Sequence, residues 1–193
     1  VVLFCGGLGT RIRDYSENIP KPMVPIGHQP VLWHVMQYYS QHGHREFVLC
    51  LGYKANAIKD YFLNYNPSAY DDCVISDFGK KVEVMGQSPP DWRISLMDTG
   101  IWRNIGQRLM AVRHLVQDEP YFLANYSDGL TDAPLPAMIE RFKKSGKAGC
   151  FIAVRPPFNF HIVDFDKENG IRRLHSSQEA DIWFNVGYFI VSN

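Results

Sequence analysis

The chain has 193 residues, and its 20 Lys and Arg residues balance 20 Asp and Glu residues, so its formal charge is zero. A zero charge disfavours a nucleic-acid-binding protein that works through a broad basic face, because counterion release requires many cations together. No apolar run approaches the roughly 20 residues that span a bilayer, and no signal segment opens the sequence, so we expect no membrane contact. The length is typical of one domain that buries its own core.

Cysteine usage points to a reducing compartment. The four cysteines lie singly, without a CxxC pair, and Cys5, Cys50 and Cys150 each lie in an apolar run of strand character. This usage is typical of reduced core thiols, and it disfavours a disulfide framework or a zinc site. We therefore expect a cytoplasmic protein.

Two periodicities of apolar residues divide the chain into elements. Uninterrupted apolar runs predict buried strands, and apolar residues three and four apart predict helices. In chain order, we expect strand 1–5, helix 30–42, strand 46–51, helix 54–64, short strands 82–85 and 94–97, helix 107–117, strand 121–125, helix 134–145 and strand 148–154. The segment 160–191 then alternates like antiparallel strands, with Glu168-Asn169-Gly170 as a hairpin turn.

This order of elements predicts an α/β fold. Strands that alternate with helices predict a mostly parallel sheet with helices on both faces. The alternating segment near the end adds a late antiparallel element. No internal repeat, low-complexity tract or linker interrupts the sequence, so we expect residues 1–193 to form a single domain.

A glycine-rich loop, Gly6-Gly7-Leu8-Gly9-Thr10-Arg11, follows the first predicted strand. An open α/β fold binds its ligand at the carboxyl edge of the sheet, where glycines let backbone N–H groups approach phosphate oxygens. The string lacks the GxxxxGK[ST] pattern of a P-loop, and Ile12 stands where the dinucleotide fingerprint GxGxxG needs its third glycine. The loop is therefore a glycine turn that ends in an arginine.

Three cations, Arg11, Arg13 and Lys21, fall within eleven residues of a chain that is neutral overall. This local concentration predicts a site for a polyanion such as a chain of phosphates. The alternative is a solvated loop with ordinary turn glycines.

Asp128 is the second candidate, because Ser127-Asp128-Gly129 directly follows the predicted strand 121–125. A carboxylate at this edge suits Mg²⁺, which usually takes one or two carboxylates plus substrate phosphates. An Asp-Gly turn in which Asp128 caps a helix is the alternative.

No GxSxG string, HxH pair or HExxH pattern indicates a protein nucleophile or a histidine metal site.

Taken together, these strings resemble the signature of the sugar-phosphate nucleotidylyltransferases. The glycine loop is followed by Lys21-Pro22-Met23 and Pro25-Ile26-Gly27, and the spacing from Arg11 to Lys21 agrees with the family. Further stretches are more similar to the glucose-1-phosphate cytidylyltransferases than to the thymidylyl or uridylyl branches. They are 32–36, 52–54, 58–62, 98–100, 106–109 and 128–129.

The resemblance implies a Rossmann-like fold of the nucleotide-diphospho-sugar transferase type. It also implies a reaction in which a nucleoside triphosphate and a sugar 1-phosphate give a nucleotide sugar and pyrophosphate. The expected substrates are CTP and a phosphorylated acceptor, with Mg²⁺ as the cofactor, and the resemblance is compatible with a homo-oligomer. The acceptor's phosphate oxygen attacks, so positioning and cations lower the barrier without a protein nucleophile.

The matching positions imply a nucleotide side of the site. Gly6, Gly7, Gly9 and Thr10 would line the nucleotide. Arg108 would lie near the base and its ribose or phosphates, with a surface residue at the start of a helix as the alternative.

The same match implies three charged groups for the chemistry. Arg11 would hold the pyrophosphate portion with a bidentate geometry that Lys cannot copy. Lys21 would neutralise the α-phosphate or the acceptor phosphate, and Asp128 would bind Mg²⁺.

The acceptor side departs from the family pattern. His161, after Phe160, stands where family members carry a glycine that meets the sugar, and segment 175–179 lacks the family's Glu-Lys-Pro. Asn185 followed by Gly187 does match the family's sugar-contact strand. We therefore place Asn185 and His161 on the acceptor side. The family reaction predicts a sugar 1-phosphate as the acceptor, and these departures favour one other than glucose 1-phosphate.

Two alternatives remain open at this point. One is a CTP-dependent cytidylyltransferase for a non-sugar phosphate such as an amino-acid phosphate. The other is a catalytically weak, nucleotide-binding regulatory paralogue. Family members also continue past the late hairpin and carry a second metal-binding aspartate there, so we expect this chain to lack the family's C-terminal segment.

Overall fold

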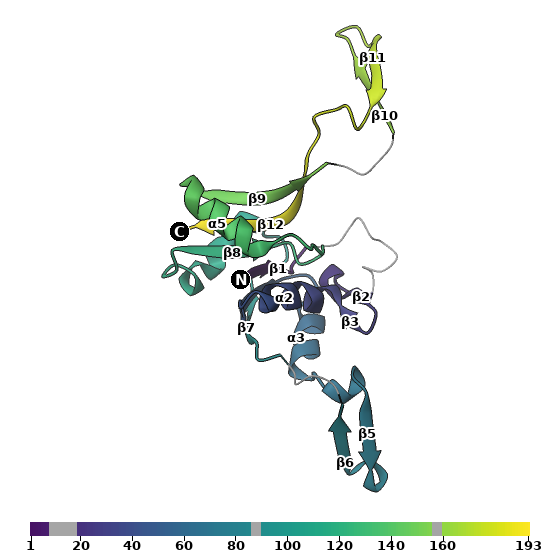
Figure 1. The fold of residues 1–193 in the computed structure, drawn as a ribbon, viewed down its shortest axis with the longest axis vertical. Helices are drawn as coiled ribbons and strands as arrows, with labels where there is room; N and C mark the ends of the chain where they lie inside the picture. The colour runs from purple at the N-terminus through teal and green to yellow at the C-terminus, as the bar shows by residue number, and fades with distance from the viewer. Residues whose placement is uncertain (8–18, 86–89, 156–159) are drawn as a thin grey trace.

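The computed structural model describes residues 1–7, 19–85, 90–155 and 160–193. Its centre is a six-stranded sheet in the order β7-β4-β1-β8-β12-β9 (Figure 1). The strands are β7 (Arg93–Asp98), β4 (Glu46–Leu51), β1 (Val2–Phe4), β8 (Tyr121–Asn125), β12 (Phe184–Ser192) and β9 (Gly149–Val154). The first four are parallel, whereas β12 is antiparallel to both β8 and β9. The predicted mostly parallel sheet with a late antiparallel element is confirmed.

Helices cover both faces of this sheet, as predicted. One face carries α2 (Val31–Gln41), α3 (Ala55–Leu63) and α5 (Leu135–Ser145), and the other carries α4 (Ile105–Val112) with the 3₁₀ turn η4 (Arg113–Leu115).

Alternation along the strands explains this division. Leu3 packs in the cluster beneath α2, α3 and α5, whereas its neighbours Val2 and Phe4 pack in the cluster beneath α4. Successive side chains of a strand point to opposite faces, so a strand covered by helices on both sides must be apolar throughout. This is why β1 and β4 read as uninterrupted apolar runs.

The predicted helix 107–117 begins earlier and ends sooner than expected. A capping box joins Asn104 and Gln107, each side chain accepting a hydrogen bond from the other residue's backbone N–H, and this starts α4 at Ile105. The chain then tightens into η4, where the N–H of Val116 donates to the carbonyl of Arg113. Apolar spacing alone does not distinguish these two kinds of turn.

Three two-stranded ribbons accompany the sheet. They are β2 (Pro25–Ile26) with β3 (Gln29–Pro30), β5 (Cys73–Ser76) with β6 (Lys81–Val84), and β10 (His161–Phe165) with β11 (Ile171–Ser176). The predicted turn at Glu168-Asn169-Gly170 lies between β10 and β11 and is confirmed. The β5–β6 and β10–β11 ribbons project from opposite ends of the molecule (Figure 1).

All four cysteines are free thiols, as predicted. Cys5 and Cys50 are fully buried, and burial raises the pKa of each to about 12. Every helix within the described ranges is too short or too polar to cross a membrane.

Candidate active site

The carboxyl ends of β1 and β8 open onto a cavity of about 750 Å³. Because β1 and β8 are parallel neighbours, the residues after each strand meet at the same edge. The lining residues come from the carboxyl ends of β1 and β8, the start of β12, the segment from β7 to the start of α4, and the short 3₁₀ helix that begins at Lys21. They are Phe4, Gly6, Gly7, Lys21, Ile101, Trp102, Arg103, Asn104, Ile105, Arg108, Tyr126, Asp128, Asn185 and Val186.

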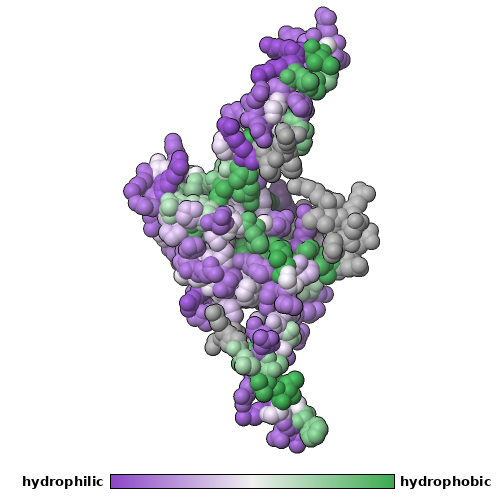
Figure 2. Space-filling model, turned by 45° about the vertical axis from the view of Figure 1, so that its right-hand side comes forward, coloured by the Kyte–Doolittle hydropathy of each residue, from purple (hydrophilic) through white to green (hydrophobic). Residues whose placement is uncertain are grey.

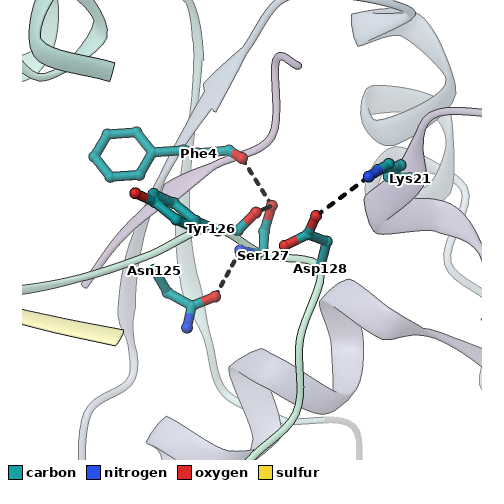
Figure 3. A network of polar contacts seen from close by, with 6 residues as sticks. All are labelled: Phe4, Lys21, Asn125, Tyr126, Ser127 and Asp128. Carbon is teal, nitrogen blue, oxygen red and sulfur yellow. Dashed lines mark hydrogen bonds and ion pairs between the residues drawn. The ribbon is translucent and has the colours of Figure 1, made fainter. Parts of the chain in front are cut away.

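A strained turn after β8 presents Asp128 to this cavity. Ser127 is fully buried and has a left-handed φ of 60°, a conformation that non-glycine residues adopt rarely. Two hydrogen bonds hold it there: its hydroxyl donates to the Phe4 carbonyl at 2.9 Å, and its N–H donates to Asn125 Oδ1 at 2.6 Å (Figure 3). The turn therefore anchors β8 to β1 and fixes the direction of the carboxylate that follows.

Lys21 faces Asp128 across the cavity. The two side chains form an ion pair with an Nζ to Oδ2 distance of 3.7 Å (Figure 3). Lys21 begins the short 3₁₀ helix η1 (Lys21–Met23), which the buried prolines Pro20 and Pro22 position. The Lys21 side chain is 19% exposed and that of Asp128 is 41% exposed, so both remain open to a ligand.

Arg108 has a different environment from the one the resemblance implied. It is 4% exposed, and its guanidinium makes four hydrogen bonds with protein groups. The acceptors are the carbonyls of Gly6, Leu51 and Ile101 and the hydroxyl of Thr99, at 2.7–3.1 Å. These groups follow β1, end β4 and follow β7, so Arg108 ties together the carboxyl ends of three parallel strands. Burial lowers the pKa of the guanidinium.

Gly6 is adjacent to this guanidinium. A Cβ on Gly6 would lie 2.5 Å from Arg108 Cζ, and a Cβ on Gly52 would lie 2.8 Å from Arg108 Nη1. Among the described residues, a Cβ on Gly7 would meet nothing within 4 Å, and Gly7 is exposed. Gly6 is therefore required by the packing of Arg108, whereas no described residue places such a demand on Gly7.

Asn185 reaches the cavity from β12. Its Nδ2 donates to the Tyr126 hydroxyl at 3.3 Å, and its Oδ1 accepts from the N–H of Gly187 at 2.8 Å. Gly187 has a left-handed φ of 82°, and a Cβ there would lie 2.7 Å from Tyr126 Cγ. His161 is not among the lining residues and lies at the start of β10 on the projecting ribbon.

The structure thus brings six of the predicted site residues together at the cavity, whereas His161 lies outside its lining. Those at the cavity are Gly6, Gly7, Lys21, Arg108, Asp128 and Asn185. Gly9, Thr10 and Arg11 lie outside the described residues.

Trp102, Arg103 and Tyr126 also line the cavity, although no sequence motif singled them out. Trp102 is 85% exposed at the cavity, although a tryptophan is usually well covered. Both Trp102 and Arg103 follow the family-like string Asp98-Thr99-Gly100. That string was the sequence feature that could have identified them as site residues.

The charges that face the cavity suit a polyanion bound with a metal ion. Among the described lining residues, Lys21, Arg103 and Arg108 are cations and Asp128 is the single acid. Across the described ranges, no three His, Cys, Asp or Glu side chains gather closely enough to hold a metal ion by themselves. A lone carboxylate fits Mg²⁺ when substrate phosphates supply the other ligands.

Comparisons with known proteins agree with this geometry. The family described as Nucleotidyl transferase matches residues 1–189. The chain is 36% identical over 192 residues to glucose-1-phosphate cytidylyltransferase of Salmonella typhimurium, covering 99% of this chain and 74% of that protein. It is 33% identical to the probable glucose-1-phosphate cytidylyltransferase of Bacillus subtilis, with the same coverage.

Solved structures show the same fold at low sequence identity. HddC from Yersinia pseudotuberculosis, complexed with GMP-PN, superposes with a TM-score of 0.63 at 21% identity and covers 99% of this chain and 75% of its own. UTP-bound UGPase from Acinetobacter baumannii superposes with a TM-score of 0.65 at 18% identity and covers 99% and 73%. From the family match and the two relatives, the chain belongs to the sugar-phosphate nucleotidylyltransferases and is a nucleotidyltransferase enzyme.

Proposed function

We propose that this enzyme joins CTP and a sugar 1-phosphate to give a CDP-sugar and pyrophosphate. The observation that carries the proposal is the Lys21–Asp128 pair, which faces a cavity at the carboxyl edge of the sheet that Arg103 also lines. CTP is proposed because the relatives named glucose-1-phosphate cytidylyltransferase match almost the whole chain. We place the reaction in the cytoplasm, which the four free thiols favour.

The reaction requires no protein nucleophile. An oxygen of the acceptor's phosphate forms a bond to the α-phosphorus of CTP, and the bond from that phosphorus to the oxygen bridging to the β-phosphate breaks. Pyrophosphate then leaves with the electron pair of that bond. The barrier comes from repulsion between anions, which fixed cations and correct positioning lower.

The proposed site residues divide these tasks, and Arg11 is included from the sequence match alone. Lys21 neutralises the α-phosphate or the acceptor phosphate, and Arg11 holds the departing pyrophosphate. The exposed Gly7 leaves room for the triphosphate to approach the backbone. Asn185 is on the acceptor side, beside Tyr126.

Asp128 is the residue that would hold Mg²⁺. When bound, the ion neutralises phosphate charge and orients the phosphate oxygens. The buried Ser127 contributes by fixing the backbone that carries Asp128.

A second candidate acceptor is a non-sugar phosphate. In segment 175–179, His175 lies 3.3 Å from Asp164 and Glu179 lies 3.8 Å from Arg173. Asp164, Arg173 and His175 belong to the β10–β11 ribbon and Glu179 follows it, and all four are absent from the cavity lining. The acceptor side departs from the family pattern in sequence, and the segment that departs is absent from the described cavity lining, which favours testing acceptors beyond sugars.

Pyrophosphate release tests the proposal. The purified chain is incubated with CTP, Mg²⁺ and a panel containing glucose 1-phosphate, other sugar 1-phosphates and amino-acid phosphates. We expect release with CTP and at least one sugar 1-phosphate. Release only with a non-sugar phosphate would support the second candidate. CTP binding without release for any acceptor would identify a nucleotide-binding paralogue and overturn both enzyme assignments.

Base selectivity is measured separately by thermal shift with CTP, UTP, dTTP, ATP and GTP. A ligand that binds only the native state raises its melting temperature by mass action. We expect the largest rise with CTP, and an equal or larger rise with another nucleotide would contradict the proposed base.

A further inference from the structure

Two tyrosine hydroxyls bind the backbone of the segment that joins Asp128 to α5. Tyr188, on β12, donates to the Gly129 carbonyl at 2.8 Å, and Tyr38, on α2, donates to the Ala133 carbonyl at 2.7 Å. Both tyrosines are absent from the cavity lining. They therefore act on the backbone behind the site and are not placed to touch a ligand in the cavity.

Aromatic packing fixes these two rings. The rings of Tyr38 and Tyr188 meet edge to face with their centroids 5.7 Å apart, and Tyr39 stacks on Tyr188 at 6.0 Å. Tyr39 and Tyr188 are 1% and 2% exposed, whereas exposed hydrophobic residues gather on the two projecting ribbons (Figure 2). Aromatic pairs at such distances stabilise a fold beyond the area that they bury. The Tyr188 hydroxyl is therefore held at the end of a tightly packed ring.

This hydroxyl distinguishes Tyr188 from a purely apolar core residue. Taking a hydroxyl out of water costs free energy unless it is hydrogen-bonded, and a phenylalanine ring would fill the same space without that cost. At Tyr188 the hydrogen bond to the Gly129 carbonyl offsets the cost. The chemical difference between tyrosine and phenylalanine is thus applied to the residue directly after Asp128.

The residue before Asp128 is held from the neighbouring strand position. Register places Tyr188 opposite Asn125 on β8. Asn125 is 1% exposed, and its Oδ1 accepts from the N–H of Ser127 at 2.6 Å. Asn125 and Tyr188 therefore fix the backbone on both sides of Asp128, one residue before it and one residue after it.

The Asp128 carboxylate depends on this backbone for its direction. Within the described ranges, its only ion pair or hydrogen bond is the 3.7 Å contact with Lys21, and 41% of the side chain is exposed. Magnesium demands near-ideal octahedral geometry with ligands at about 2.0–2.1 Å. A shift of the turn would therefore weaken a metal site even with the carboxylate still present.

We propose that Tyr188 is a positioning residue for the metal site, and that its hydroxyl, bound to the Gly129 carbonyl, holds Asp128 where the carboxylate meets the Mg²⁺ of bound CTP. Loss of the hydroxyl would leave Asp128 in the chain but release the turn that carries it. The inference rests on the proposed function, which assigns Mg²⁺ to Asp128. It adds a residue that is itself absent from the cavity lining.

Calorimetric titration with CTP, once with Mg²⁺ and once in EDTA, tests this role. Tyr188→Phe removes the hydroxyl and keeps the ring. It should weaken the binding of CTP with Mg²⁺ about 10-fold, as the loss of a group that orients a metal ligand does, and leave the binding in EDTA unchanged. Asp128→Asn should show the same selective loss. Tyr121→Phe removes a hydroxyl at the other end of β8, away from the cavity lining, and is the matched control.

Magnesium titration of pyrophosphate release gives a second measurement. In Tyr188→Phe the half-saturating Mg²⁺ concentration should rise about 10-fold, while kcat at saturating Mg²⁺ stays near wild type because excess ion restores occupancy. A purely structural role would lower kcat through loss of folded enzyme and keep the wild-type Mg²⁺ dependence.

The outcomes separate this inference from the proposed function. A Tyr188→Phe variant that is folded by circular dichroism and binds CTP with Mg²⁺ like the wild type would overturn the inference alone, as would equal weakening with Mg²⁺ and in EDTA. If the wild-type chain binds no CTP, the proposed base is wrong, and the same comparison with the nucleotide that gives the largest thermal shift decides the role of Tyr188. Wild-type nucleotide binding that is independent of Mg²⁺ would overturn both the inference and the assignment of Mg²⁺ to Asp128.

Discussion

Gly6 and Arg108 are 102 residues apart in the chain, yet each constrains the other. The guanidinium of Arg108 occupies the space that a Cβ on Gly6 would need, and it donates to the Gly6 carbonyl at 2.9 Å. Arg108 is thus a positioning residue for the glycine loop, because its hydrogen bonds go to the protein. Gly7, one residue later, has no such constraint.

Gly6→Ala should therefore destabilise the fold, whereas Gly7→Ala should not. The new methyl group would displace the guanidinium and leave buried carbonyls without their donor, at a cost of about 2 kcal/mol in the free energy of unfolding. Gly7→Ala, whose methyl group would meet no described residue, should change this free energy by less than about 0.5 kcal/mol. Denaturant titration of both variants measures the difference, and equal midpoints would contradict this role for Arg108.

Lys21 is the described cation that lies closest to the proposed metal ligand. Lys21→Ala should lower kcat/KM by about 10²-fold, as the loss of a fixed charge from a transition state does. Lys147→Ala removes an exposed lysine that is not part of the cavity lining and serves as the matched control. Steady-state rates of pyrophosphate release compare the two, and near wild-type activity of Lys21→Ala would show that the site is placed wrongly.

Among the secondary-structure elements, α4 links the fold to the site. Its capping box fixes the first turn, and its buried residue Arg108 reaches the ends of three strands. Sequence spacing predicted a helix here but placed its start at residue 107, because an apolar stripe does not include the polar cap. Polar capping residues set where a helix begins, and apolar spacing sets which side it buries.

Asn104→Ala should reduce the free energy of unfolding by about 1 kcal/mol, because the N–H of Gln107 loses its acceptor. Asn104→Asp keeps a carboxylate oxygen at the same place and should recover most of that loss. Thermal or denaturant unfolding measures both changes. If Ala and Asp destabilise the chain equally, the capping box does not stabilise α4.

For the molecule as a whole, the sheet separates two kinds of cysteine environment. Cys5 and Cys50 lie inside the core with a pKa near 12, whereas Cys73 is partly exposed on the β5–β6 ribbon. The thiolate is the reactive form, so both burial and a raised pKa protect the core thiols. Cys73 lacks this degree of burial.

A thiol reagent should therefore modify Cys73 first in the native chain. Cys5 and Cys50 should react only on the timescale of unfolding, and all four thiols should react in denaturant. Cys73→Ser should remove the fast phase and leave the slow phases unchanged. Rapid modification of Cys5 or Cys50 in the native chain, located by peptide mass analysis, would contradict the buried core described for β1 and β4.

Much of the architecture could be predicted from local patterns. The strands 46–51 and 121–125 match β4 and β8, because uninterrupted apolar runs identify strands covered on both faces. The position of Asp128 at the carboxyl edge also followed, since parallel strands end on the same side of the sheet. These features depend on the order and periodicity of side chains, which a sequence displays directly.

The sequence by itself thus determined the α/β fold, the family and the edge where the ligand site lies. Only the tertiary structure decided which side chains meet there. In the structure, the buried Arg108 donates a hydrogen bond to the Gly6 carbonyl, and Lys21 forms an ion pair with Asp128. His161 lies on the β10–β11 ribbon and not in the cavity lining. Periodicity shows which face a side chain occupies within its own element, but distances between elements depend on how all of them pack.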